Sequence, residues 1–271
     1  MTLHKFVFSP TGGTKKAASF LCQNWGGKEN NIDLTTGTIP RVDFEPGDLA
    51  VFALPVYAGR LPPAAVNRLQ ALKGNKTPAV ALVVYGNRAY EDALLELKNT
   101  VNSLGFRCVA AVAAVARHSI VDSIAPFRPD LQDYAQLSAF FDKIQDKIRT
   151  LPSPGTQSLE KRGPDSGTGT GKTLDFYVPG NFPYKEITPV PLVPELTGDC
   201  SFCGVCARRC PVKAISPDDY AQVDSKKCIS CMRCLRLCTR KARSLPPEKL
   251  QPLAARLEKL CSDRKENELF L

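Results

Sequence analysis

Eight of the eleven cysteines in this chain of 271 residues lie in one short segment, and they repeat a single spacing. The first four follow the pattern C-x2-C-x2-C-x3-C-P and are Cys200, Cys203, Cys206 and Cys210. The same spacing returns 28 residues later in Cys228, Cys231, Cys234 and Cys238. Because a duplication that keeps its cysteines keeps the chemistry of each copy, the repeat predicts two equivalent sites.

Thiolates at this spacing are typical of iron–sulfur ligands. Three cysteines placed two residues apart can wrap one face of a compact cluster, and a fourth ligand must then come from elsewhere in the chain. Zinc is the alternative, but zinc ligands usually come as separated C-x2-C pairs, which a third cysteine at the same interval fits poorly. We therefore predict two [4Fe–4S] clusters and keep two four-cysteine zinc sites as the alternative.

The cysteine segment resembles the bacterial two-cluster ferredoxins, which carry two [4Fe–4S] clusters on a small α+β fold. The resemblance covers about residues 196–245, and Thr239 departs from it by replacing the proline that follows the fourth cysteine. In the bacterial pattern the fourth cysteine of each motif ligates the other cluster. The resemblance thus implies one ligand set of Cys200, Cys203, Cys206 and Cys238. It implies a second set of Cys210, Cys228, Cys231 and Cys234.

Proline and glycine mark where the cysteine segment joins the rest of the chain. Residues 151–198 hold eight Pro and seven Gly, a fraction that argues against packed secondary structure. The predicted parts are residues 1–150, a linker at 151–195, the ferredoxin domain at 196–246 and a C-terminal helix or tail at 247–271. Residues 167–173 look like a nucleotide-binding P-loop, but Ser166 stands where that motif needs its first glycine. We interpret this stretch as flexible linker.

Residues 1–150 alternate short apolar runs with helical patterns. The predicted strands are residues 5–9, 31–35, 49–55, 78–85 and 108–116. The predicted helices are residues 15–23, 64–72, 90–104 and 131–148. This alternation predicts an α/β fold with a doubly wound parallel sheet, whose right-handed crossovers place helices on both faces. Ligands of such sheets bind at the carboxyl ends of the strands.

A glycine-containing turn between the first strand and the first helix can bind phosphate. Glycine lets backbone N–H groups point inward, hydroxyl groups add donors, and the start of a helix adds partial positive charge. The candidate residues are Ser9, Thr11, Gly12, Gly13, Thr14 and Lys15. The turn resembles the Ser/Thr-x-Thr-Gly-x-Thr loop with which flavodoxins hold the phosphate of FMN, although Lys15 and Lys16 depart from that pattern. The alternative is an ordinary turn capped by Thr14.

The resemblance to flavodoxins covers about residues 1–150, and it implies that two later loops flank the flavin ring. These loops follow the third and fourth strands, and their candidate residues are Pro55, Tyr57, Gly59, Arg60, Gly86, Asn87 and Tyr90. Tyr57 and Tyr90 are candidates for stacking on the ring, with plain packing as the alternative. His118 follows the last strand and is interpreted as a surface residue rather than a proton donor. The three cysteines without a matching ligand set are Cys22, Cys108 and Cys261.

A flavin and two clusters in one chain indicate electron transfer, because clusters pass single electrons whereas flavins exchange one or two. The whole chain resembles the flavodoxin–ferredoxin fusions of strictly anaerobic prokaryotes, which implies an oxygen-sensitive setting. We favour an electron carrier, with an FMN-dependent reductase of a small molecule and a redox or iron–sulfur sensor as the alternatives. No dinucleotide fingerprint follows a predicted strand, so direct use of NAD(P)H is disfavoured.

The chain carries a formal charge of +9, and the basic excess is concentrated around the cysteines. Residues 199–244 hold ten Lys and Arg against four Asp and Glu. This surplus offsets the charge of bound clusters and FMN, and the remainder favours an acidic redox protein over a nucleic acid as partner. No apolar run approaches the ~20 residues that span a membrane, and the N-terminus lacks a signal-peptide pattern. We therefore expect a cytoplasmic protein whose cysteines serve metal or redox chemistry rather than disulfides.

Overall fold

A six-stranded sheet with the order β2-β1-β3-β4-β5-β8 forms the centre of the first domain. The computed structural model describes residues 1–150, 176–187 and 192–271, so the P-loop-like stretch at 167–173 lies outside the described residues. The strands are β1 (Thr2–Val7), β2 (Lys28–Asp33), β3 (Leu49–Pro55), β4 (Pro78–Tyr85), β5 (Arg107–Val115) and β8 (Glu268–Phe270). The first five strands are parallel. Their order is that of the flavodoxin fold, which confirms the predicted α/β architecture.

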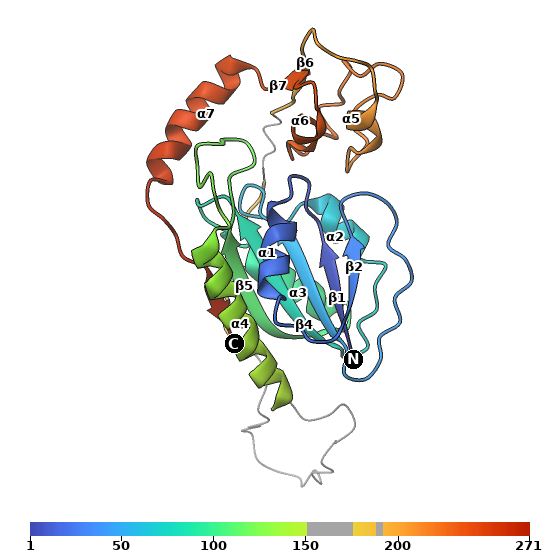
Figure 1. The fold of residues 1–271 in the computed structure, drawn as a ribbon, viewed down its shortest axis with the longest axis vertical. Helices are drawn as coiled ribbons and strands as arrows, with labels where there is room; N and C mark the ends of the chain where they lie inside the picture. Colours follow the sequence, from blue (N-terminus) through green and yellow to red (C-terminus); the bar gives the residue numbers. More distant parts are fainter. Residues whose placement is uncertain (151–175, 188–191) are drawn as a thin grey trace.

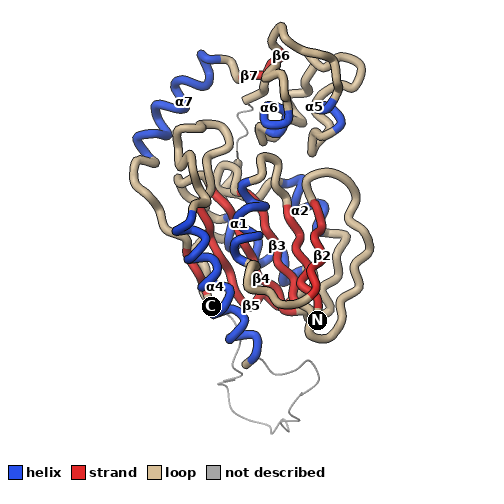
Figure 2. Tube along the Cα trace, in the orientation of Figure 1, coloured by secondary structure: helices blue, strands red, loops and turns tan. Residues whose placement is uncertain are grey.

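Helices cover both faces of this sheet (Figures 1 and 2). The helices are α1 (Gly13–Leu21), α2 (Pro63–Leu69), α3 (Ala93–Ser103) and α4 (Leu131–Arg149). Alternate residues of β3 explain the two layers, because successive side chains of a strand point to opposite faces. Phe52 packs in the core beneath α2 and α3, whereas Val51 packs in the core beneath α1 and α4. Burial on both faces is why β3 and β4 read as continuous apolar runs.

The cysteine segment forms a small second unit beyond the carboxyl ends of the strands (Figure 1). It contains the helices α5 (Val205–Arg208) and α6 (Arg233–Leu237) and a two-stranded antiparallel sheet of β6 (Glu195–Leu196) and β7 (Arg243–Ser244). This is the small α+β unit expected after the linker. Its position places the cysteines over the edge of the large sheet where ligands of such folds bind.

The C-terminal residues return to the first domain instead of ending as a tail. Helix α7 (Pro247–Leu260) leads away from the second unit, and β8 then pairs antiparallel with β5. Figures 1 and 2 show this return beside α4. The sequence predicted the helix but not the strand, because three residues are too few to show a periodic pattern.

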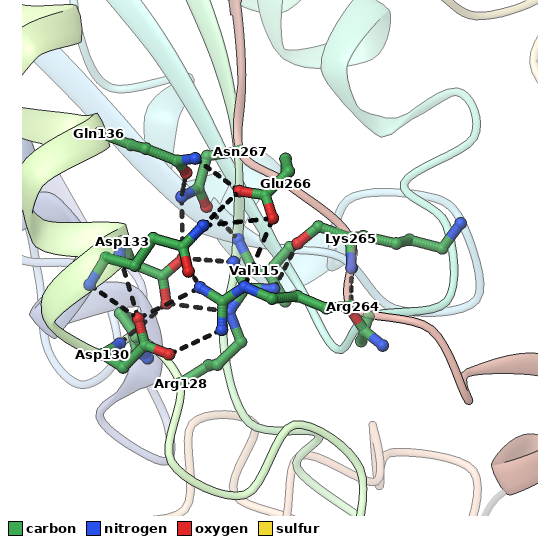
Figure 3. Close-up of polar contacts among 12 residues, drawn as sticks. Val115, Arg128, Asp130, Asp133, Gln136, Arg264, Lys265, Glu266 and Asn267 are labelled. Atoms are coloured by element: carbon green, nitrogen blue, oxygen red, sulfur yellow. Dashed lines mark hydrogen bonds and ion pairs between the residues drawn. The ribbon is translucent and has the colours of Figure 1, made fainter.

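A buried polar network fixes this returning segment to the sheet (Figure 3). Asp133 is fully buried and accepts hydrogen bonds from Arg128 Nε at 2.9 Å and Asn267 Nδ2 at 2.9 Å. Asn267 also accepts one from the backbone N–H of Val115 at 2.9 Å. Arg264 donates to the carboxylate of Asp130 at 2.7 Å, and it holds the pKa of that carboxyl well below its usual value. The C-terminal segment is therefore part of the first domain's structure.

Part of the proline-rich segment also packs on the first domain. Phe176 is buried, and Asp92 accepts hydrogen bonds from the backbone N–H groups of Asn181 at 2.8 Å and Lys185 at 2.7 Å. Residues 176–187 contain neither helix nor strand, as the proline and glycine content predicted. Among the residues that the structure describes, no helix is long and apolar enough to cross a membrane.

Candidate functional site

A pocket with an open volume of about 650 Å³ lies at the carboxyl edge of the sheet. It is formed by the loops that follow β1, β3, β4 and β5. The structure brings together seven of the residues predicted from the sequence for FMN binding. These lining residues are Thr11, Gly13, Thr14, Pro55, Tyr57, Gly59 and Gly86.

The turn after β1 has the geometry of an anion-binding loop. Gly12 adopts a left-handed backbone with φ of 96° directly before α1, and no acidic residue lies in the first turn of that helix. Ser9 Oγ accepts a hydrogen bond from the backbone N–H of Lys15 at 2.9 Å, so this hydroxyl shapes the turn. Of the predicted phosphate-loop residues, Ser9, Gly12 and Lys15 do not line the pocket. The free N–H groups at the start of α1 and the hydroxyls of Thr11 and Thr14 fit a phosphate.

The loop after β3 places Tyr57 and Gly59 in the pocket and turns Arg60 away. Tyr57 and Arg60 exchange backbone hydrogen bonds of 2.9 and 3.1 Å across a tight turn. Gly59 has φ of 84°, and a Cβ there would lie 2.9 Å from the Cβ of Glu91, so both the backbone angle and the space favour glycine. Arg60 instead pairs with Glu96 at 2.7 Å. Its guanidinium is therefore engaged outside the pocket.

The loop after β4 is held by the C-terminal segment. Asn87 Nδ2 donates to the carbonyl oxygens of Cys261 at 3.1 Å and Asp263 at 2.8 Å. Tyr90 donates to Glu268 at 3.1 Å, and its burial beside that carboxylate raises its pKa well above the ordinary value. Asn87 and Tyr90 thus lie outside the pocket lining, with their polar groups bound by residues distant in sequence.

Sequence reasoning missed several residues that line the pocket. They include Tyr85, Arg88, Arg117 and Ser119. His118, which the sequence analysis interpreted as a surface residue, is half-buried and also lines the pocket. Its Nδ1 accepts backbone hydrogen bonds from Ile120 at 3.2 Å and Val121 at 3.0 Å. In the neutral ring the proton is therefore on Nε2. Burial lowers the pKa of His118, which disfavours the charged form of the ring. The available signal was position, because each of these residues ends or follows a strand at the same edge of the sheet.

The eight clustered cysteines surround two separate cavities, each with an open volume of about 390 Å³. We call the cysteines of the cavity nearer the large sheet the inner set, which is Cys210, Cys228, Cys231 and Cys234. The outer set lines the other cavity and is Cys200, Cys203, Cys206 and Cys238. Each cavity thus combines three cysteines of one motif with the fourth of the other, and all eight are free thiols.

Backbone N–H groups point at the sulfurs of both sets. Ala214 donates to Cys210 Sγ at 3.3 Å, and Ala242 donates to Cys238 Sγ at 3.2 Å. These two contacts occupy the same place in each copy of the repeat. Burial and neighbouring thiols raise the pKa of Cys231 to about 12, so a bound metal would be needed to hold it as a thiolate. In the described parts of the chain, no three His, Cys, Asp or Glu side chains group tightly enough to hold a single metal ion.

The inner set faces the pocket across a contact between the two units. Arg233, in α6, donates to the carbonyl oxygen of Pro10 in the phosphate loop at 3.0 Å. Ile229 packs against the core of the first domain. Tyr57 lines the pocket, and burial, with a smaller contribution from the Cys231 thiol, raises its pKa well above its usual value. The two candidate cofactor sites are therefore neighbours.

We expect Thr11→Lys to lower the FMN content of the purified protein at least about tenfold, a loss of about 1.4 kcal/mol in binding. The longer side chain would fill the space that the loop leaves for a phosphate, and the hydroxyl donor would be lost. Thr38→Lys, at an exposed position outside the pocket, is the matched control and should keep its flavin. Equal flavin content in the two variants would show that this loop does not bind the phosphate.

Comparison with known proteins separates the two halves of the chain. Residues 196–216 match the family described as the 4Fe-4S binding domain, which includes the first cysteine motif. No curated protein matches the chain. Several solved structures resemble its first half. A flavodoxin from Streptococcus pneumonia TIGR4 is 16% identical, with 54% of this chain and 99% of that chain covered and a TM-score of 0.39.

Two further solved structures cover a similar part of the chain. The two-electron reduced flavodoxin of Megasphaera elsdenii is 13% identical, covering 51% of this chain and 98% of its own, with a TM-score of 0.33. An NADH:FMN oxidoreductase in its apo form is 17% identical, with 57% of this chain and 92% of that chain covered and a TM-score of 0.37. The fold assignment rests on the strand order of the sheet, and the iron–sulfur assignment rests on the cysteine spacing and the family match.

Proposed function

We propose that this chain, which joins a flavodoxin-like sheet to a 4Fe–4S ferredoxin-type region, transfers electrons between an FMN and two [4Fe–4S] clusters. The observation that carries the proposal is the contact between the second unit and the pocket, where Arg233, which lines the cavity of the inner set, donates to Pro10 of the phosphate loop. Clusters exchange single electrons and a flavin exchanges one or two. The clusters and the flavin together can therefore collect electrons one at a time and release them as a pair.

The first domain's residues would bind and orient the flavin. Thr11, Gly13 and Thr14, with the start of α1, are suited to its phosphate, because N–H and hydroxyl donors converge there. The ring of Tyr57 offers an aromatic face in the same pocket. The basic side chain of Arg88 also lines the pocket, where its guanidinium pairs with Glu91.

The second unit's cysteines would bind the clusters in the crossed arrangement. The inner set combines Cys210 of the first motif with three cysteines of the second, and the outer set combines Cys238 with three of the first. The backbone N–H groups of Ala214 and Ala242 would donate to ligand sulfurs in each site. We infer that the physiological partner is an acidic redox protein, because basic residues surround the cysteines.

One observation favours a second function, an FMN-dependent reductase of a small molecule. His118 lines the pocket, and its Nε2 is the ring nitrogen that carries a proton. A neutral imidazole N–H in that position can orient a substrate carbonyl or donate a proton. His118→Phe would lower turnover of such a substrate while leaving electron exchange with a protein partner unchanged.

Anaerobic purification followed by cofactor analysis tests the proposed function. We expect about eight irons and eight acid-labile sulfides per chain, together with one FMN, because each [4Fe–4S] cluster contains four of each atom. Stoichiometric zinc without sulfide would contradict the cluster assignment. Full iron content without any flavin would contradict the role of the first domain.

A further inference from the structure

The two cysteine sets differ in how far they reach the surface. The outer set includes Cys203, which is exposed, and the adjacent Phe202 keeps 72% of its side chain exposed. In the inner set Cys231 is buried, and its neighbours Ile229 and Arg233 contact the first domain. Among the described residues, the outer set is therefore the one that presents a cysteine and an aromatic ring to an approaching molecule.

Basic side chains flank the exposed cysteine. Gly204 lies so close to Arg208 that a Cβ there would be 2.6 Å from its Nη1, which places the guanidinium over the loop between Cys203 and Cys206. Arg240 is exposed and lines the outer cavity. Arg208 is also exposed. The positive potential of this face would attract negatively charged partners.

An exposed aromatic ring among arginines has the composition of a protein-binding hot spot. Tyr, Trp and Arg carry much of the binding energy in protein interfaces, and Phe is enriched in them as well. Phe202 has a left-handed backbone with φ of 53° and is exposed. Arg208 and Arg240 are exposed basic side chains placed at this loop and cavity, and the exposed Asp199 and Asp219 are the acidic residues nearest in sequence to Phe202 and Tyr220.

We propose that Phe202, Arg208 and Arg240 form the docking face for an acidic redox protein, and that this partner exchanges electrons at the outer set. The inference rests on the proposed function and adds to it the place where the partner binds. Each exchange moves one electron between the partner's redox centre and the cofactor held by the outer set, and no bond forms or breaks. The inner set, turned toward the pocket, does not contact the partner.

Calorimetric binding of a small acidic plant-type [2Fe–2S] ferredoxin to the anaerobically purified protein tests the docking face. Arg208→Glu/Arg240→Glu should weaken binding at least about tenfold at low ionic strength, because two attractive charges become repulsive. Lys226→Glu/Lys259→Glu is the matched control, since it changes the net charge equally at exposed positions that do not line the outer cavity. The control should weaken binding by no more than about threefold.

A second variant separates the aromatic contact from the charge. Phe202→Ala should also weaken binding of the same ferredoxin, and this loss should persist at high ionic strength, where charge contributions are screened. Equal weakening by the two charge-reversal pairs, or no detectable binding to the unchanged protein, would overturn the docking face. Iron and flavin contents are measured first, because missing cofactors would contradict the proposed function, whereas full loading with unaffected binding would contradict only the docking face.

Discussion

Cys210→Ser is expected to lower the iron content from about eight to about four atoms per chain, with loss confined to the inner site. Cys210 belongs to the first motif in sequence, yet its sulfur lines the cavity formed by the second motif. A serine oxygen is a harder ligand than a thiolate and binds iron–sulfur clusters less well. The measurement is iron and sulfide analysis of the anaerobically purified variant, together with its electron paramagnetic resonance spectrum after reduction.

The spectrum decides which site is lost. Cys228→Ser removes a cysteine that lines the cavity of the inner set, and Cys200→Ser removes one that lines the cavity of the outer set. Cys210→Ser should give the spectrum of Cys228→Ser, and a match to Cys200→Ser would refute the crossed arrangement. Cys261→Ser replaces a buried cysteine outside both sets and should retain all the iron.

Asp133→Ala is expected to lower the free energy of unfolding by about 3–5 kcal/mol, the range for removing one partner of a buried ion pair. The carboxylate is fully buried and accepts hydrogen bonds from Arg128, from Asn267 and from the backbone N–H of Asp130. Its loss would leave the buried guanidinium of Arg128 without its counter-charge (Figure 3). It would also release the segment that carries β8.

Urea unfolding under anaerobic conditions measures this effect against a matched control. Asp146→Ala removes a carboxylate from the same helix, but its pair with Arg149 is exposed to solvent. Exposed pairs at this spacing contribute at most about 0.5 kcal/mol. A similar loss of stability in the two variants would show that the network of Figure 3 does not hold the C-terminal segment.

The sequence predicted the bounds of β3 and β4 well and those of β1 less well. The bounds of β3 and β4 match the prediction, because strands buried on both faces are apolar throughout. The prediction began β1 at residue 5, whereas the strand begins at Thr2. The prediction missed its start because two buried positions of the strand carry polar side chains, which hide the apolar pattern. His4 pairs with Asp48 at 3.1 Å and Lys5 with Glu29 at 2.7 Å. Such partners are distant in sequence, so a local pattern does not reveal them.

The pocket was predictable as a set of loops but not as a set of side chains. Parallel strands bring their carboxyl ends to one edge, which is why three loops could be named from the order of elements alone. Which side chains enter the pocket depends on partners elsewhere. Arg60 is drawn away by Glu96, Asn87 by the carbonyls of Cys261 and Asp263, and Tyr90 by Glu268. The positions of Asn87 and Tyr90 therefore depend on the C-terminal segment that returns to the sheet.

The spacing of the cysteines indicated two sites, but it held no information on how they face the first domain. That orientation depends on contacts such as Arg233 with the phosphate loop and Ile229 with the core of the sheet. Arg233 and Pro10 of the phosphate loop are more than 200 positions apart in the sequence. These contacts make one set a neighbour of the pocket and leave the other exposed.

The central claim, that electrons pass between the flavin and the iron–sulfur region through the inner set, is tested most directly by rapid mixing. The oxidised, fully loaded protein is mixed anaerobically with reduced [2Fe–2S] ferredoxin, and the absorption of the flavin is followed in time. Cys210→Ser, with its flavin retained, should reduce that flavin far more slowly than the unchanged protein does. Flavin reduction at the same rate in both proteins would contradict the claim.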